Sequence, residues 1–159
     1  VSWELGRAKG LDLRPSGGDG VWWTVELPDG KAIISAANPH SQESRYLYFD
    51  VDGAFAYDLF DRTVTVSVAY RDAGCSSFQL EYDNTDPAQG LHEGAFRKAG
   101  EVSVGNTRGW KTAEFSLPNC RFMDRCNSAD FRLVVLGREL ELTIRAVRVT
   151  RAGTEGEKQ

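Results

Sequence analysis

The sequence lacks the signatures of the common catalytic and metal sites. Its two histidines, His40 and His92, have no further ligand or catalytic partner at a meaningful spacing. The 159 residues contain no GxSxG, HExxH, CxxC or phosphate-loop pattern. An enzyme needs a group of residues that together activate and stabilise the reacting atoms. Because the sequence offers no such group, we expect a domain that is not itself an enzyme.

Long apolar runs and an excess of positive charge are also missing. No stretch of about 18 apolar residues occurs, so the sequence predicts no segment that spans a membrane. The 19 lysines and arginines are outnumbered by 23 aspartates and glutamates, which gives a formal net charge of −4. This balance argues against the phosphate backbone of a nucleic acid as a partner. We therefore expect neither a membrane nor a nucleic acid among the partners.

Cysteine is scarce, and the three cysteines cannot all pair within one chain. Cys120 and Cys126 are close enough in sequence to form a small-loop disulfide in an oxidising compartment, which leaves Cys75 over. Three buried thiols are an equally good interpretation, since free cysteine behaves as a small apolar residue. Cysteine usage therefore does not decide the compartment.

The sequence does have a clear period of two between residues 45 and 84. Apolar residues recur there at every second position in three successive runs, which predicts strands with one wet face. Such alternation is typical of antiparallel sheets. The segment 71–74 (RDAG) supplies a turn and predicts a hairpin over about residues 63–83. A similar pattern predicts a second hairpin over 101–117.

The rest of the chain repeats this pattern of short strands and turns. About ten such strands favour an all-β fold, a two-sheet antiparallel β-sandwich or a barrel. We predict one domain over residues 1–152, with no helix longer than about two turns. A one-residue phase shift near Arg145 indicates a β-bulge. Residues 153–159 lack an apolar anchor and are predicted to form a disordered tail.

Several aromatic residues fall on the polar side of the predicted strands or in a loop. Flat rings with a polar rim suit sugars, whose C–H faces pack on aromatics while polar side chains take the hydroxyls. Alternatively, a second layer or a long loop such as 83–99 covers these rings as ordinary core. Trp22 and Trp23 must point to opposite faces if they share a strand. The residues on the polar side are Trp22, Tyr46, Tyr48 and Tyr57.

Two acidic residues, Asp50 and Asp52, are predicted to share one face of a strand. Adjacent carboxylates repel each other unless something positive lies between them. An arginine such as Arg45 or Arg62 would serve, and so would Ca²⁺, which takes carboxylate and carbonyl oxygens. The abundance of arginine favours the salt bridge.

Six phrases of the sequence together resemble a known family pattern. In this order they are similar to accessory β-jelly-roll domains of the galactose-binding-like superfamily. Those domains are appended to glycoside hydrolases and polysaccharide lyases of secreted bacterial systems. The phrases are GGDG at 17–20, RYLYFDVDGAF at 45–55, VTVSVAYRDAGCSSFQLEYDN at 64–84, GWKTAEFSLPNCRF at 109–122, SADFRL at 128–133 and LTIRAVRV at 142–149.

The resemblance implies a jelly-roll carbohydrate-binding module that is extracellular or periplasmic and accompanies a parent catalytic domain. It also implies a structural Ca²⁺ near the sheet edge. The acidic residue that such domains carry just before the core of the last strand corresponds here to Glu141. Together with the acidic pair on the earlier strand, the expected calcium ligands are Asp50, Asp52 and Glu141.

From the residues and the resemblance together, we expect a non-catalytic module that binds a polysaccharide and keeps a parent enzyme on it. The alternative is a structural sandwich that packs on a catalytic domain and binds no glycan of its own. The expected sugar-contacting rings are Trp22, Tyr57 and Trp110. The expected hydrogen-bonding groups, all in the loop at 118–129, are Arg121, Arg125 and Asn127.

Overall fold

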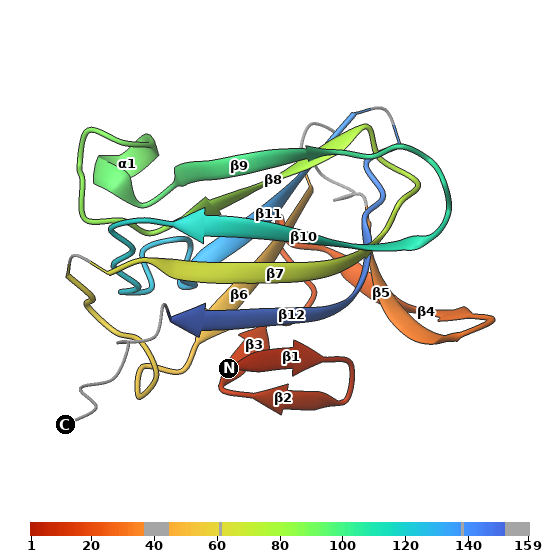
Figure 1. The fold of residues 1–159 in the computed structure, drawn as a ribbon, viewed down its shortest axis with the longest axis horizontal. Coiled ribbons are helices and arrows are strands. Elements are labelled where there is room, and N and C mark those ends of the chain that lie inside the picture. The colour runs from red at the N-terminus through yellow and green to blue at the C-terminus, as the bar shows by residue number, and fades with distance from the viewer. Residues whose placement is uncertain (37–44, 61, 138, 152–159) are drawn as a thin grey trace, which may run out of the picture.

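The computed structural model of the chain describes residues 1–36, 45–60, 62–137 and 139–151. Within these residues, two five-stranded antiparallel sheets pack face to face. In Figure 1, β7, β10 and β12 of one sheet lie in front of β6 and β11 of the other. The predicted all-β, two-sheet sandwich is confirmed. The predicted tail at 153–159 lies outside the described residues.

Each sheet combines strands from distant parts of the sequence. The first sheet has the order β10 (Trp110–Leu117), β7 (Val64–Arg71), β12 (Thr143–Arg151), β5 (Gly30–Ser35) and β4 (Trp22–Leu27). The second sheet has the order β3 (Leu11–Leu13), β6 (Arg45–Val51), β11 (Phe131–Leu136), β8 (Ser77–Tyr82) and β9 (Arg97–Ser103). The short strands β1 (Ser2–Glu4) and β2 (Arg7–Lys9) pair with each other, and α1 (Leu91–Gly94) is a single helical turn.

The two predicted hairpins, over 63–83 and 101–117, are wrong. β7 and β8 form where the alternation places them, but they belong to different sheets, and so do β9 and β10. The expected turns are instead crossings from one layer to the other. Both layers bury one face against the same core, so alternation reveals the buried side of a strand without revealing its partner.

Asp72 fixes these two crossings to each other. Its side chain is fully buried, and its carboxylate accepts hydrogen bonds from the backbone N–H groups of Gly105 (2.6 Å) and Thr107 (3.1 Å). The Thr107 hydroxyl adds a third bond at 2.7 Å, and Lys111 pairs with the same carboxylate at 2.8 Å. The segment after β7 is therefore tied to the loop before β10 rather than folded back on β7.

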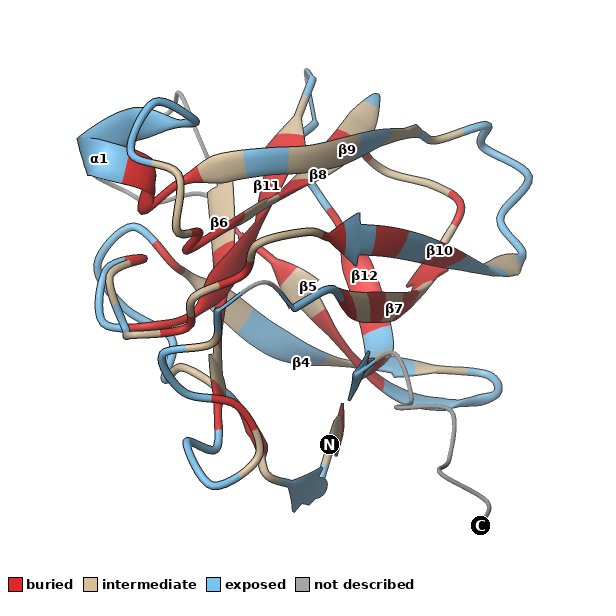
Figure 2. Ribbon diagram, turned by 60° about the vertical axis from the view of Figure 1, so that its left-hand side comes forward, coloured by how far each residue is buried: buried red, intermediate tan, exposed pale blue. Residues whose placement is uncertain are grey.

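The core fills the space between the sheets with the residues that the alternation selects. Val64, Val66 and Val68 on β7 are fully buried, as are Phe78 and Leu80 on β8. Each such side chain stabilises the fold by roughly 1.5–3 kcal/mol relative to an exposed position. In Figure 2 the buried residues lie mainly on β6, β7, β11 and β12, whereas β4 and α1 are largely exposed.

Two local features complete the first sheet. The register between β12 and β7 shifts between Ile144 and Ala146, which confirms the predicted β-bulge. The N-terminal ammonium of Val1 donates to the carbonyl of Val149 at 2.9 Å, and the Val149 amide donates back to the Val1 carbonyl at 2.9 Å. The first residue of the chain is therefore held beside the last strand.

We expect Asp72→Asn to destabilise the protein most at neutral pH. The Lys111 ammonium and the Thr107 hydroxyl hold the pKa of the folded Asp72 carboxyl well below its usual range. This interaction stabilises the folded state above about pH 4, the pKa of an unfolded aspartate, and the gain is lost as the pH falls below that. Thermal unfolding from pH 7 to pH 3 should show a loss of several degrees that shrinks on acidification.

The control for Asp72→Asn is Glu26→Gln, because Glu26 forms a well-exposed ion pair with Lys31 at 3.1 Å. Exposed pairs contribute little, so its melting temperature should change by about one degree or less at every pH. Equal losses in the two variants, or a loss in Asp72→Asn that grows on acidification, would contradict the role given to Asp72.

Candidate functional site

A second hydrophobic layer covers the outer face of the second sheet. Tyr48 on β6 packs there with Phe96 and Ala95, which follow α1, and with Cys126 and Ala129 from the loop before β11. The Tyr48 side chain is 6% exposed, so the expectation of an exposed ring at this position is wrong. The alternative, that long loops cover part of this face as ordinary core, is confirmed for Tyr48.

Arg132 on β11 holds this layer together. Its guanidinium pairs with Glu81 on β8 (2.6 Å) and lies over the rings of Tyr46 (4.1 Å) and Phe96 (4.3 Å). A further N–H group of Arg132 donates to the hydroxyl of Tyr48 at 3.1 Å. Only 9% of the residue is exposed. Cation–π contacts and a charge-assisted pair therefore compensate the burial of this charge.

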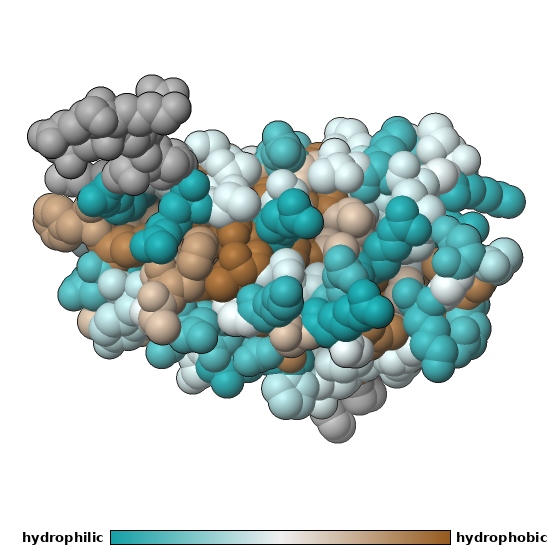
Figure 3. All heavy atoms as spheres, turned by 60° about the horizontal axis from the view of Figure 1, so that its bottom comes forward, coloured by the Kyte–Doolittle hydropathy of each residue, from teal (hydrophilic) through white to brown (hydrophobic). Residues whose placement is uncertain are grey.

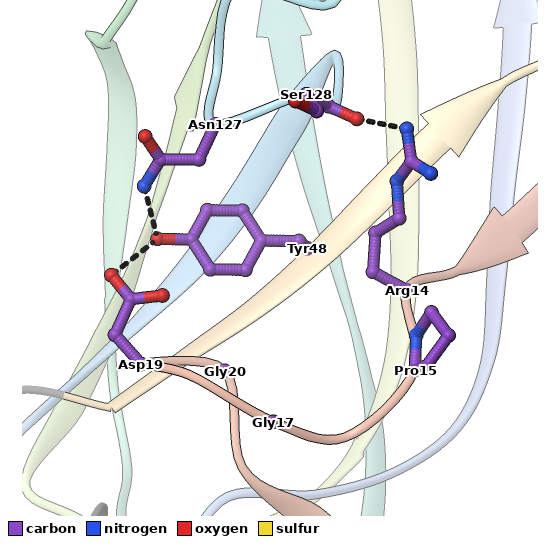
Figure 4. A pocket seen from close by; sticks show the side chains of 8 residues that line it. All are labelled: Arg14, Pro15, Gly17, Asp19, Gly20, Tyr48, Asn127 and Ser128. Carbon is purple, nitrogen blue, oxygen red and sulfur yellow. Dashed lines mark hydrogen bonds between the residues drawn. The ribbon is translucent and has the colours of Figure 1, made fainter.

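A pocket of about 280 Å³ opens at the edge of this layer. Its walls come from the loop at 14–20, from Tyr48 on β6, and from Asn127 and Ser128 in the loop before β11. Figure 4 shows Asp19 and Asn127 beside the hydroxyl end of the Tyr48 ring and Arg14 on its other side. Segments more than 100 residues apart in the sequence thus meet around one aromatic ring.

The Tyr48 hydroxyl organises the polar side of the pocket. It accepts hydrogen bonds from Asn127 Nδ2 (2.9 Å) and from Arg132, and it donates to Asp19 Oδ2 (3.0 Å). This uses the single proton and both lone pairs of the hydroxyl. Burial raises the pKa of Tyr48 to about 12, although Arg132 and Asn127 oppose the shift, so the group stays neutral at physiological pH.

Arg14 contributes the positive charge of the pocket. Its guanidinium pairs with Asp50 at 3.2 Å and donates to the carbonyl oxygen of Ser128. Its Nε atom is buried and has no hydrogen-bond partner among the described residues. A buried donor without a partner lowers the stability of the folded state by about 1–3 kcal/mol.

The GGDG run brings the loop at 14–20 onto Tyr48. The backbone N–H and C=O groups of Gly17 and Gly20 bond to each other in a tight turn, at 3.0 and 3.3 Å. A Cβ atom at Gly20 would lie 2.9 Å from Cδ2 of Tyr48, which is too close for a carbon contact. Glycine at position 20 therefore permits the close approach that places Asp19 at the hydroxyl of Tyr48.

Of the three polar residues expected to bind a ligand, the structure places only Asn127 in this pocket. Arg125 is fully engaged in fixing loops: it pairs with Asp83 (2.7 Å) and donates to the carbonyl oxygens of Asn84 (2.8 Å) and Glu93 (3.1 Å). Arg121 pairs with the exposed Asp58 at 3.2 Å.

The expected aromatic platform is not assembled as predicted. Trp22 is half-buried against the core, and its indole N–H donates to the carbonyl of Arg14 at 2.9 Å. Its neighbour Trp23 is 58% exposed instead, so the predicted orientation of the pair is reversed. Trp22 thus supports the loop that forms the pocket.

Trp110 and Tyr57 lie on other parts of the molecule. Trp110 begins β10 in the first sheet; its indole donates to Asp29 at 2.6 Å, and Arg145 lies 4.2 Å over its ring. Tyr57, in the connection between β6 and β7, is 55% exposed. Neither ring lines the pocket at Tyr48.

The structure gathers a different set of carboxylates from the one predicted for calcium. Oxygen atoms of Asp50, Asp124 and Asp130 lie within 4.8 Å of one another. Of the predicted ligands, only Asp50 belongs to this set. Asp52 accepts the backbone N–H of Ala54 in a turn (2.9 Å), and Glu141 is exposed just before β12. The structure therefore groups Asp50 with Asp124 and Asp130 rather than with Asp52 and Glu141.

The three grouped carboxylates offer the hard oxygen atoms that Ca²⁺ prefers. Part of their capacity is already used, since Asp130 accepts the backbone N–H groups of Val51 (2.9 Å) and Asp124 (3.2 Å). The positive partner of Asp50 is Arg14 rather than the suggested Arg45 or Arg62. The residues present thus provide a partial ligand set whose remaining lone pairs could hold a cation.

The three cysteines, Cys75, Cys120 and Cys126, are buried free thiols. Burial raises the pKa of Cys75 to about 11 and that of Cys120 to about 12. The thiols therefore remain protonated at physiological pH, and the alternative of three buried thiols is the correct one.

Sequence reasoning missed four residues of these two clusters. Arg14 and Asp19 lie in a stretch that its glycines and proline mark only as a loop, and Asp124 and Asp130 flank another loop. The one available signal was GGDG, because an acidic residue inside a glycine turn is presented by the backbone. Nothing in the sequence indicated that this turn lies against Tyr48.

No protein-family model matches the chain, and no curated protein matches it in sequence. Solved structures are similar to it along most of its length. The C-terminal CBM6 module of the laminarinase LamC from Zobellia galactanivorans matches at 13% identity and a TM-score of 0.51, over 94% of this chain and 98% of that one. The K1 cleaved adhesin domain of Lys-gingipain from Porphyromonas gingivalis matches at 11% identity and a TM-score of 0.54, over 96% and 98%.

A further match is the CBM22-1 and GH10 portion of the xylanase Xyn10B from Clostridium thermocellum, solved with xylohexaose. It matches at 13% identity and a TM-score of 0.50, over 91% of this chain and 26% of that one. At these identities the likeness establishes the fold. The chain has the jelly-roll β-sandwich found in carbohydrate-binding modules, as its resemblance to the family implied. No helix among the described residues is long and apolar enough to cross a membrane.

We expect the stability of the protein to fall between about pH 4 and pH 7 because of Asp130. Burial raises the pKa of this carboxyl to about 7 in the folded state, with a smaller contribution from the charges of Asp124 and Asp50. The folded state therefore holds a proton that the unfolded state has released, and stability drops by up to about 1.4 kcal/mol per pH unit. Asp130→Asn should remove this dependence of the unfolding free energy on pH, measured by urea unfolding at a series of pH values.

Asp52→Asn is the matched control for Asp130→Asn. Asp52 is an exposed aspartate directly after β6, the strand whose last amide, that of Val51, donates to Asp130. The Asp52→Asn variant should retain the pH dependence of the unmodified chain. If the unfolding free energy of Asp130→Asn still falls between about pH 4 and pH 7, another group is responsible for the pH dependence. The comparison uses slopes, because Asp130→Asn also loses backbone hydrogen bonds and is expected to be less stable at every pH.

Proposed function

We propose that this domain is a carbohydrate-binding module whose pocket at Tyr48 takes one sugar residue of a polysaccharide. The observation that carries the proposal is the ring of fixed polar groups around a small cavity, with Asp19 and Asn127 on one side and Arg14 on the other. A site whose side chains are already held in place loses little entropy on binding.

The free polar atoms of the pocket match the hydroxyl groups of a sugar. The second carboxylate oxygen of Asp19 and the amide oxygen of Asn127 have no hydrogen bond to another described residue. Neighbouring sugar hydroxyls both donate and accept, so they can satisfy these atoms together. A cavity of about 280 Å³ is near the small end of ligand sites and suits a single ring.

The fold supports the same function at a coarser level. Several solved structures with this fold are carbohydrate-binding modules, and the one from Clostridium thermocellum was solved with xylohexaose. In our proposal the domain keeps a parent carbohydrate-active enzyme on its polysaccharide, outside the cell or in the periplasm. Tyr57 and Trp110, which lie outside the pocket, remain proposed contacts for further residues of a glycan chain.

The second candidate is a structural sandwich that packs on a catalytic domain. It is favoured by the large exposed side chains in the connection between β6 and β7, where Tyr57 and Phe60 are 55% and 74% exposed. The face shown in Figure 3 also carries a band of hydrophobic residues between hydrophilic ones. Exposed hydrophobic patches of this kind mark protein–protein contacts as well as ligand sites.

We expect Asp19→Ala to weaken glycan binding at least tenfold. The change removes an acceptor for sugar hydroxyls and leaves the Tyr48 proton without its partner. Affinity electrophoresis against plant, algal and microbial polysaccharides would measure the loss. The control is Glu26→Ala, an exposed position on β4 that should bind like the unmodified chain. Absence of binding to every polysaccharide, with the fold intact, would favour the structural alternative.

The calcium ion is a separate part of the proposal, and we place it at Asp50, Asp124 and Asp130. Calcium at about 100 times its Kd would add about 2.7 kcal/mol to the free energy of unfolding. EDTA should therefore lower the melting temperature, and Asp124→Asn should abolish this sensitivity while the half-buried control Asp86→Asn, outside this carboxylate group, retains it. A melting temperature unaffected by EDTA and by added calcium would remove the ion and leave the glycan proposal standing.

A further inference from the structure

The charges around the pocket indicate which class of sugar it accepts. We infer that the pocket at Tyr48 selects neutral, hydroxyl-rich sugar residues and discriminates against residues that carry a carboxylate or sulfate. This inference rests on the proposed function. It follows from three properties of the described residues: an unpaired carboxylate in the wall, a neutralised arginine opposite it, and a shortage of free donors.

Asp19 is the unpaired carboxylate. Among the described residues it forms no salt bridge, and the Tyr48 hydroxyl at 3.0 Å is its hydrogen-bond partner. In Figure 4 the second oxygen of Asp19 points toward the cavity beside the Tyr48 ring. An anionic group on a sugar held against this wall would face a like charge at short range, which is unfavourable even in a partly solvated site.

Arg14 does not offset this charge, because it is already paired. Asp50 lies 3.2 Å from its guanidinium. The next cation, Arg132, is buried and paired with Glu81. Among the described residues that line the pocket, an acidic ligand would therefore meet the unpaired carboxylate of Asp19 and an arginine, Arg14, that is already paired.

The hydrogen bonds lead to the same conclusion. The single proton of the Tyr48 hydroxyl goes to Asp19, and one N–H of Asn127 goes to Tyr48. The atoms left over are mainly acceptors: one oxygen of Asp19 and the amide oxygen of Asn127. Acceptors recognise hydroxyl groups, which donate, whereas a carboxylate or sulfate only accepts.

The test compares sugars that differ only in charge. Short oligosaccharides of glucose, galactose and mannose are titrated against the unmodified domain, alongside the matching uronic-acid oligosaccharides, at low ionic strength. Chemical shift changes in NMR spectra give the affinities. We expect the neutral member to bind at least tenfold more tightly in whichever series binds, and added salt to narrow this difference, because salt screens the repulsion.

Asp19→Asn is the decisive variant. Its amide oxygen can still accept the Tyr48 proton. Because Asp19 itself lines the pocket, the measured quantity is the ratio of the affinities for the neutral and the acidic sugar, not the affinity for the neutral sugar alone. The charge is gone, so the preference over the uronic-acid form should fall to about threefold or less. Glu26→Gln, which removes a carboxylate from exposed β4, should keep the original preference.

Two results would overturn the inference while leaving the module a glycan binder. One is equal or tighter binding of the acidic member by the unmodified domain. The other is a preference that survives unchanged in Asp19→Asn. If no sugar of either class binds in any series, the proposed function fails and the inference fails with it. A melting curve of each variant confirms that the fold is retained.

Discussion

The buried guanidinium of Arg132 is the interaction on which the outer layer of this domain depends. A charge in this position is costly unless every partner is in place. Glu81 neutralises it, the guanidinium lies over the rings of Tyr46 and Phe96, and the Tyr48 hydroxyl accepts a hydrogen bond from it. The partners come from β6, β8 and the segment after α1, and Arg132 itself lies on β11, so the arrangement sets how these elements fit together.

The pocket is a consequence of that arrangement. Because Arg132 fixes the hydroxyl of Tyr48, the remaining lone pair and proton of the hydroxyl have definite directions, and Asn127 and Asp19 occupy them. Gly20 allows the loop that bears Asp19 to lie against the ring. The polar groups that would meet a ligand are thus held by the fold itself, which is the usual basis of affinity in a small site.

The sequence predicted the layers better than the contacts between distant segments. Alternation identified the buried side of β7 and β8 correctly, because it depends only on neighbouring residues. It did not reveal that these strands lie in different sheets, since that depends on Asp72 meeting the loop at 105–109. For the same reason the sequence pointed to Asn127 and Asp50 as single residues but missed two residues that the fold brings beside them. Asp19 lies 29 positions from its partner Tyr48, and Arg14, which pairs with Asp50, lies 114 positions from Ser128.

The repeated crossing between sheets also governs how the chain acquires its structure. Between the described strands, seven connections lead from one five-stranded sheet to the other, so neither sheet is made of one continuous stretch. They follow β3, β5, β6, β7, β9, β10 and β11. Neither can be completed before most of the chain has been organised, and no half of the sequence contains a self-sufficient sheet. To form either sheet, the chain must close long loops early, and the entropy cost of this closure makes folding slow. Because neither sheet can form alone, folding is cooperative and all-or-none.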